Sequence, residues 1–234
     1  MISCRLDKDA NTVGLWNFFD SAIDYSGNGK TITLGGTPSY EMGQLGKKIN
    51  LSQNSYGEWP VATNYGKQTK CTLEYIIERP DPDSFDGTYP RLFTSGDGGG
   101  YSWPDAQFYI ASSYSVTWLR WRYDVSGNWT YFSGGLPIYS TDYPIFYVVI
   151  AWDDNVPYGY IWVNGILQKD WATGKMAILQ SATTKERISK IGNANYSYIY
   201  GGELKIYRIR ISNTLRKPEE LLHNWLRLPQ ILNA

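Results

Sequence analysis

The chain has 234 residues, with 22 lysines and arginines balanced by 22 aspartates and glutamates, so its formal net charge is zero. This balance argues against binding to nucleic acid or to an anionic membrane by charge alone. No run reaches the roughly 18 apolar residues of a membrane-spanning helix, so we expect no membrane insertion. The length suits a single large β-sandwich domain covering residues 1–234.

Short strands separated by polar turns are predicted along the first half of the chain. They cover residues 13–19, 31–34, 48–51, 56–61 and 71–78, where apolar and β-branched residues recur over strand-sized lengths. The first turn between them is DYSGNG at residues 24–29. Between residues 79 and 100, dense Pro, Asp and Gly predict a pair of surface loops around the apolar pair Leu92 and Phe93.

The strand predicted at residues 71–78 carries a cysteine and two carboxylates. Cys71 alternates in phase with Leu73, Tyr75 and Ile77, which predicts a buried thiol in the core. Cys4 and Cys71 are too few for a disulfide framework. Glu74 and Glu78 share a face of this strand, and we interpret them as charges on a solvent-exposed face.

The second half of the chain contains the strongest strand signal, the continuous apolar run Ile145–Trp152, which predicts a buried core strand. Asn164 and Gly165 accept positive φ and predict a tight hairpin between strands at 160–163 and 166–168. Other strands are predicted at 107–111, 116–123, 129–132, 188–191 and 204–211.

A short amphipathic helix is predicted at residues 218–228. Pro218 suits the first turn, and Glu219 and Glu220 suit the positive end of the helix dipole. The predicted apolar face consists of Leu221, Leu222, Trp225 and Leu228. The helix is therefore expected to pack on the sandwich.

The segment YPIFYVVIAWDDNVPYGYIWVNGILQKDW from Tyr143 to Trp171 resembles the laminin-G-like jelly rolls of the concanavalin A-like lectin and glucanase superfamily. Further matches follow in the family's order: GLWNFFD at 14–20, DYSGNG at 24–29, CTLEYIIE at 71–78, ISKIGN at 188–193 and LKIYRIRISNTLRKPEEL at 204–221. The resemblance covers about residues 13–226. It implies an all-β fold, a two-sheet antiparallel β-sandwich of the jelly-roll type with a short C-terminal helix, and leaves the function open.

The resemblance also implies a structural calcium ion at the DYSGNG turn. Asp20, Asp24, Ser26 and Asn28 offer hard oxygen ligands there. The alternative, which we favour, is an ordinary Asx or glycine turn, because calcium takes about six to eight ligands and the sequence offers only part of that shell.

Aromatic residues are abundant, with 10 Trp and 20 Tyr. Flat rings stack on sugars, and Trp, Tyr and Arg also mark protein interfaces, so glycan binding and partner binding stay equally open. In the segment TWLRWRY, one face of the predicted strand takes Thr117, Leu119, Trp121 and Tyr123, and the less core-like face takes Trp118, Arg120 and Arg122. The predicted binding residues are Trp103, Tyr114, Trp118, Arg120, Arg122 and Trp129.

Catalysis is not expected. Glycosidases of this superfamily carry closely spaced carboxylates on one strand, whereas Glu74 and Glu78 lie four residues apart, about 13 Å at the rise of a strand. The single histidine, His223, excludes a histidine metal cluster and is interpreted as a solvated or capping residue.

These features together predict a non-enzymatic, lectin-like binding module. The N-terminal MISCRLDKDANT lacks the apolar segment of a secretory signal, which favours a phage protein made in the host cytoplasm and located on the virion surface, as tail, fibre or capsid decoration. Its partners would be cell-surface glycan or other virion proteins. One alternative is a purely structural virion subunit, and finding a homo-oligomer in solution would favour it. The other alternative is a bacterial carbohydrate-binding module or enzyme at the cell surface.

Overall fold

The computed structural model describes residues 6–52, 55–60, 68–78, 91–95, 105–110, 117–125, 128–136, 144–153, 155–156, 158–171, 188–192 and 203–228. At residues 105–136 it describes only how the strands pair. Among the described residues, no helix has the length and apolar character needed to cross a membrane.

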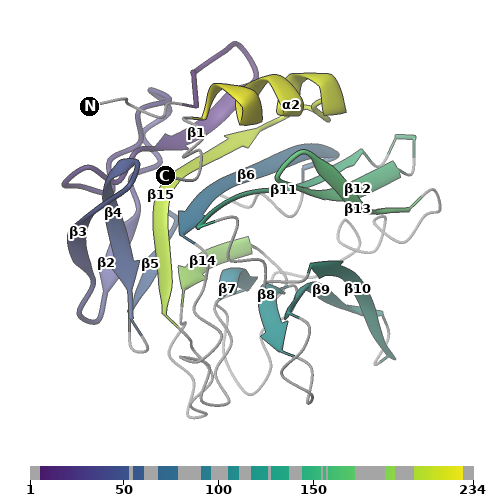
Figure 1. The fold of residues 1–234 in the computed structure, drawn as a ribbon, viewed down its shortest axis with the longest axis horizontal. Coiled ribbons are helices and arrows are strands. Elements are labelled where there is room, and N and C mark those ends of the chain that lie inside the picture. The colour runs from purple at the N-terminus through teal and green to yellow at the C-terminus, as the bar shows by residue number, and fades with distance from the viewer. Residues whose placement is uncertain are drawn as a thin grey trace.

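Two antiparallel sheets make up the fold (Figure 1). The eight-stranded sheet runs in the order β13 (Ile166–Trp171), β12 (Tyr158–Val163), β11 (Ile145–Asp153), β6 (Lys70–Glu78), β15 (Leu204–Ser212), β4 (Gly46–Leu51) and β3 (Ser39–Gly43), with β1 (Thr12–Trp16) also paired to β15. The seven-stranded sheet runs in the order β10 (Asn128–Leu136), β9 (Thr117–Val125), β8 (Asp105–Ile110), β7 (Arg91–Ser95), β14 (Ile188–Gly192), β5 (Tyr56–Glu58) and β2 (Thr33–Gly35). The predicted all-β sandwich is confirmed.

The main core lies between the two sheets. All nine residues of β11 are buried, as its apolar run predicts. Cys71, Leu73, Tyr75 and Ile77 of β6 belong to this core, where Cys71 is a buried free thiol, so the predicted alternation is confirmed. Burial raises the pKa of the Cys71 thiol well above its usual value.

The hairpin between β12 and β13 is also confirmed. Asn164 has a φ of 48° and Gly165 a φ of 87°, the left-handed conformation at both central positions of a type I′ turn. The Asn164 side chain extends the ladder of β11, because its Oδ1 accepts a hydrogen bond of 2.7 Å from the Tyr147 backbone N–H. Its Nδ2 donates to the carbonyl of Ile145 at 3.3 Å.

A second cluster of buried apolar residues lies on the outer face of the eight-stranded sheet, beneath helix α2 (Pro218–Arg227). Figure 1 shows this helix lying across the sheet on the side away from β7 to β10. Leu221 and Leu228 are buried there and Trp225 is half-buried, as predicted. The expectation for Leu222 is wrong, since this residue is 42% exposed at the margin of the contact.

Two strands were not expected from the sequence. β3 is an edge strand, and its residues SYEMG are exposed or half-buried. Because none of these residues is fully buried, its sequence has no apolar alternation from which a strand could be predicted. β7 includes Leu92 and Phe93, which are fully buried in the main core. The prediction of loops around this pair is therefore wrong at residues 91–95, and the rest of residues 79–100 lies outside the described part of the chain.

Candidate functional site

The two faces of the seven-stranded sheet are distinguished by Phe93, which is buried in the main core. Phe93 pairs with Ala106, Ala106 with Trp121, and Trp121 with Phe132. Directly paired residues of antiparallel strands share a face, so these four positions lie on the inner face of the sheet. The alternate positions of the strands form the outer face, except in β7, where a register shift between Arg91 and Phe93 leaves both Leu92 and Phe93 in the core.

One row of positions crosses the whole outer face. From β2 to β10 it contains Thr33, Glu58, Lys190, Thr94, Asp105, Arg122 and Tyr131. Where side chains are described they are polar and reach solvent, since Thr33 is exposed and Glu58 and Lys190 are half-buried. The Lys190 ammonium lies 3.9 Å from a carboxylate oxygen of Glu58 and 5.0 Å from the centre of the Tyr56 ring.

Four of the six predicted binding residues fall on this outer face. Trp118, Arg120 and Arg122 occupy alternate positions of β9, which agrees with the predicted division of its two faces. Trp129 of β10 pairs with Asp124 and so shares that face. Trp103 and Tyr114 lie outside the described residues. The assignment of these residues to binding stays a prediction.

The DYSGNG turn is held by hydrogen bonds to Asp24, which is nearly buried. Its Oδ1 accepts from the backbone N–H groups of Leu15 at 3.0 Å and Ser26 at 2.8 Å. Its Oδ2 accepts from the Ser26 hydroxyl at 2.8 Å and the Lys30 backbone N–H at 2.9 Å. Both oxygens are thus occupied by donors of the chain itself, and the carboxylate ties the turn to β1.

The other predicted calcium ligands also have partners within the protein. The exposed Asp20 carboxylate pairs with Lys47, and the Asn28 amide donates to the carbonyls of Thr12 and Val13 at 3.3 Å. Among the residues described, no cluster of three His, Cys, Asp or Glu is arranged to hold a metal. This arrangement does not fit a calcium site, and the calcium ion stays a prediction that the geometry disfavours.

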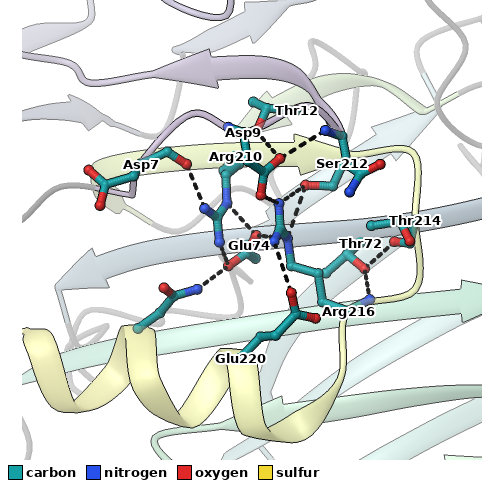
Figure 2. A network of polar contacts seen from close by, with 12 residues as sticks. Asp7, Asp9, Thr12, Thr72, Glu74, Arg210, Ser212, Thr214, Arg216 and Glu220 are labelled. Carbon is teal, nitrogen blue, oxygen red and sulfur yellow. Dashed lines mark hydrogen bonds and ion pairs between the residues drawn. The ribbon is translucent and has the colours of Figure 1, made fainter.

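Glu74 is the centre of a buried polar network beneath α2 (Figure 2). It has no exposed surface, so its interpretation as a solvent-face charge is wrong. The Arg210 guanidinium binds both carboxylate oxygens at 2.6 Å from the adjacent strand β15. Arg216 lies 3.2 Å from Oε2, and the Tyr147 hydroxyl donates to Oε1. Two cations and a phenol therefore surround one carboxylate. Because Glu74 has no exposed surface, a substrate could not reach this carboxylate.

Titration of these groups follows from their burial and charge. Burial and the nearby Glu74 raise the pKa of Tyr147 well above its usual value. Burial alone would lower the pKa of Arg210, but Glu74 raises it above the usual value, so this guanidinium stays charged. The pair is a fixed structural salt bridge.

The network joins the two ends of the described chain. Arg216 donates to Asp9 at 2.6 Å, and Arg227 of α2 donates to Asp7 at 2.9 Å. Burial raises the pKa of Asp9, but the hydrogen bonds from Arg216 and Thr12 outweigh this and hold it below the ordinary value. An open pocket of about 450 Å³, lined by charged and polar residues, lies here between residues 7–9 and α2.

Within this pocket the acidic and basic groups are largely matched to each other, which favours a structural role. His223 lines the pocket and is exposed, as predicted for a solvated histidine.

Glu78, at the other end of β6, is half-buried and pairs with Lys48. Burial and this carboxylate raise the pKa of Tyr207, whose hydroxyl donates to Glu78 at 3.2 Å. The two carboxylates of β6 thus form ion pairs at two separate places, Glu74 with two arginines and Glu78 with a lysine.

The chain matches no protein-family model and no curated protein sequence. Its fold is similar to that of the binding domain of Paraclostridial mosquitocidal protein 1, with a TM-score of 0.63 at 14% identity, over 92% of this chain and 52% of that one. Domain 4 of an extracellular arabinanase from Geobacillus stearothermophilus, in complex with arabinotriose, has a TM-score of 0.63 at 15% identity over 93% and 99%. A structure of botulinum neurotoxin type C, whose cell entry depends on interaction with two ganglioside molecules, has a TM-score of 0.64 at 10% identity over 92% and 50%.

These likenesses concern the fold, because identities of 10 to 15% carry no functional residue across. The chain spans about half the length of the two toxin structures and nearly all of the arabinanase domain. The shared architecture is a β-sandwich found in binding domains. Membership of the laminin-G-like branch in particular stays a prediction.

Proposed function

We propose that the chain is a non-enzymatic, lectin-like module that binds glycan on the outer face of the seven-stranded sheet. The observation that supports this most is the register of β9 and β10, which brings Trp118, Arg120, Arg122 and Trp129 to one face. Aromatic rings stack on the apolar faces of sugars, and planar polar groups bind their hydroxyls. Weak binding at each site would be strengthened by many copies.

Two of the structurally similar proteins bind glycans, arabinotriose in one case and ganglioside in the other. This makes a glycan the ligand class to test first. Catalysis is not part of the proposal, because Glu74 is bound by two arginines and lies four residues from Glu78 on β6.

The test is a glycan array followed by calorimetry on the best ligand. We expect saturable binding and a roughly tenfold loss of affinity, about 1.4 kcal/mol, when Trp118→Ala removes one stacking ring. Tyr25→Ala is the matched control, since Tyr25 is 46% exposed in the DYSGNG turn and belongs to no strand of the seven-stranded sheet. Absence of binding by folded protein to every glycan would contradict the proposal.

An assembly role is the second candidate, supported by exposed apolar side chains at the start of β13 and on α2. Its exposed side chains are Ile166, Leu167, Leu222 and Leu226. The hairpin tip lies against α2, because a Cβ built at Gly165 would be 3.3 Å from the Trp225 ring. Exposed apolar patches mark protein interfaces. A stable oligomer in light scattering that Leu226→Glu converts to monomer would favour this role, and a monomeric wild type would count against it.

The location that we propose is the surface of a phage virion, where a tail, fibre or decoration protein contacts the cell. A composition of zero net charge with 20 Tyr and 23 Gly suits a rigid, exposed surface and supports this location. Mass spectrometry of purified virus particles tests it directly. Finding the chain only on bacterial cells would instead favour the extracellular alternative.

A further inference from the structure

The outer face of the seven-stranded sheet has two rows of charged residues that differ in their balance. In the first row, opposite charges are neighbours: Glu58 pairs with Lys190, and Asp105 pairs with Arg122. Cross-strand neighbours of opposite charge stabilise each other, so this row is neutral within itself.

The second row has no acidic residue at the four positions that the described strand register places in it. Arg91 of β7 pairs with Gln107 of β8, Gln107 pairs with Arg120 of β9, and Arg120 pairs with Ser133 of β10. Arg91 and Arg120 thus lie two strand spacings apart, about 10 Å. Asp105 is directly opposite Arg122 and only diagonal to Arg120, whereas the residues directly opposite Arg120 are the uncharged Gln107 and Ser133.

An aromatic position lies beside this row. Trp118 occupies the outer-face position of β9 two residues before Arg120, about 7 Å along the strand. Its cross-strand neighbours are Tyr109 of β8 and Gly135 of β10. Glycine within a strand often marks a place where a ligand approaches the sheet closely. A tryptophan position, a glycine position and an arginine position with uncharged cross-strand neighbours therefore adjoin.

We propose that this part of the outer face binds an acidic glycan, with Arg120 pairing with a carboxylate or sulfate group and Trp118 stacking on the sugar ring. Arginine suits such a group because its planar guanidinium forms two parallel hydrogen bonds to a planar carboxylate. Arg91 provides a second cation for a chain that carries repeated acidic groups. The inference rests on the proposed glycan-binding function and narrows its ligand to acidic sugars.

The experiment measures affinity of the whole chain for polygalacturonate, heparin, linear arabinan and dextran at two salt concentrations. We expect binding to polygalacturonate or heparin that Arg120→Ala weakens about tenfold, the usual effect of losing a charged hydrogen bond. Raising the salt should weaken the same binding, because salt screens exposed charges. Carboxylate preference appears as stronger binding to polygalacturonate, and sulfate preference as stronger binding to heparin.

Three variants separate the roles of charge, stacking and folding. Lys47→Ala removes one exposed cation from the other sheet and should leave affinity unchanged. Arg120→Lys keeps the charge but loses the two-pronged geometry, and should retain only part of the binding. Trp118→Ala should weaken binding to every glycan that binds. Circular dichroism of each variant checks that the fold is intact.

Two results would overturn the inference in distinguishable ways. Binding to arabinan or dextran that matches the acidic polymers, with no effect of Arg120→Ala, would refute the acidic ligand and leave the proposed glycan-binding function standing. Binding to none of the four polymers and to no glycan on the array would refute both.

Discussion

Substituting Glu74 tests whether the buried network holds the fold together. Glu74→Gln keeps the size of the side chain but removes its charge, and turns an amide donor toward the guanidinium groups of Arg210 and Arg216. Arg210 would then keep its 2.7 Å hydrogen bond to the Asp7 carbonyl and at most one to the remaining side-chain oxygen at position 74, with no opposite charge beside it, while being almost fully buried. Removing one partner of a buried ion pair costs about 3 to 5 kcal/mol.

For a domain of this size, that loss lowers the melting temperature by about 2 to 4 °C per kcal/mol, or about 6 to 20 °C in total. Urea unfolding followed by tryptophan fluorescence measures the free energy directly. Glu219→Gln is the matched control, because Glu219 is exposed on the adjoining helix and should change stability by less than about 0.5 kcal/mol.

A double variant separates the cost of an unpaired charge from the loss of packing. Glu74→Leu combined with Arg210→Met should be more stable than Glu74→Leu alone, since both members of the strongest pair are then replaced by apolar groups. The reasoning would be refuted if Glu74→Gln unfolded within 1 kcal/mol of the wild type, as roughly expected only for an exposed pair.

Three further predictions concern the turns and the chain end. Asp24→Ala should lower the free energy of unfolding by at least about 2 kcal/mol, since four donors lose their acceptor. An equal loss of stability in calcium and in chelator would support the role of Asp24 in the turn. Stabilisation of the wild type by calcium would instead support a metal site. Asn164→Ala should cost about 1 to 2 kcal/mol in thermal unfolding, because it loses a left-handed preference and the bond to Tyr147; no change in stability would contradict this. The pKa of Asp9 is lower in the folded protein than its ordinary value. The ion pair between Asp9 and Arg216 therefore stabilises the fold fully when the pH is above that ordinary pKa, and the stabilisation is lost as the pH falls through the lowered pKa. Asp9→Asn should therefore lower stability by less than about 1 kcal/mol at pH 7, because the carboxylate is partly exposed. The deficit should shrink as the pH falls below the ordinary pKa of an aspartate, and a deficit that does not change with pH would contradict the ion-pair account.

Local patterns allowed much of the fold to be predicted. The apolar run of β11, the Asn164 and Gly165 turn and the alternation around Cys71 each depend on neighbours within a few residues. Strand β7 could not be found in this way, because Leu92 and Phe93 are too short an apolar signal among Pro, Asp and Gly. Their burial depends on pairing with β8 and β14, which the local sequence does not specify.

Glu74 shows a different limit of sequence reasoning. A carboxylate on an otherwise alternating strand ordinarily indicates a solvent-exposed face, and here helix α2 and the N-terminal segment cover that face. The partner cation, Arg210, is 136 residues away in the sequence. The useful signal was the predicted apolar face of α2, since a helix packed on the sheet must bury some of its outer residues.

For the candidate site, the sequence supplied the division of β9 into two faces, and the structure supplied its neighbours. Only the register shows that Arg122 lies opposite Asp105 while Arg120 lies opposite Gln107. Which arginine has an acidic residue directly opposite it is a property of strand pairing, and no single strand contains that information.

The contact between Asp7 and Arg227 means that residues almost at opposite ends of the described chain meet on the outer face of the eight-stranded sheet. The proposed sugar-binding face belongs to the opposite layer of the sandwich. A tag, a fluorescent protein or an immobilising anchor joined near either of these residues would extend from the far side, so the module can be displayed on a bead or an array with its recognition surface facing the solution. The same proximity suits a circularly permuted form, provided that the joining peptide lies beyond Leu6 and Leu228, which belong to the buried cluster beneath α2.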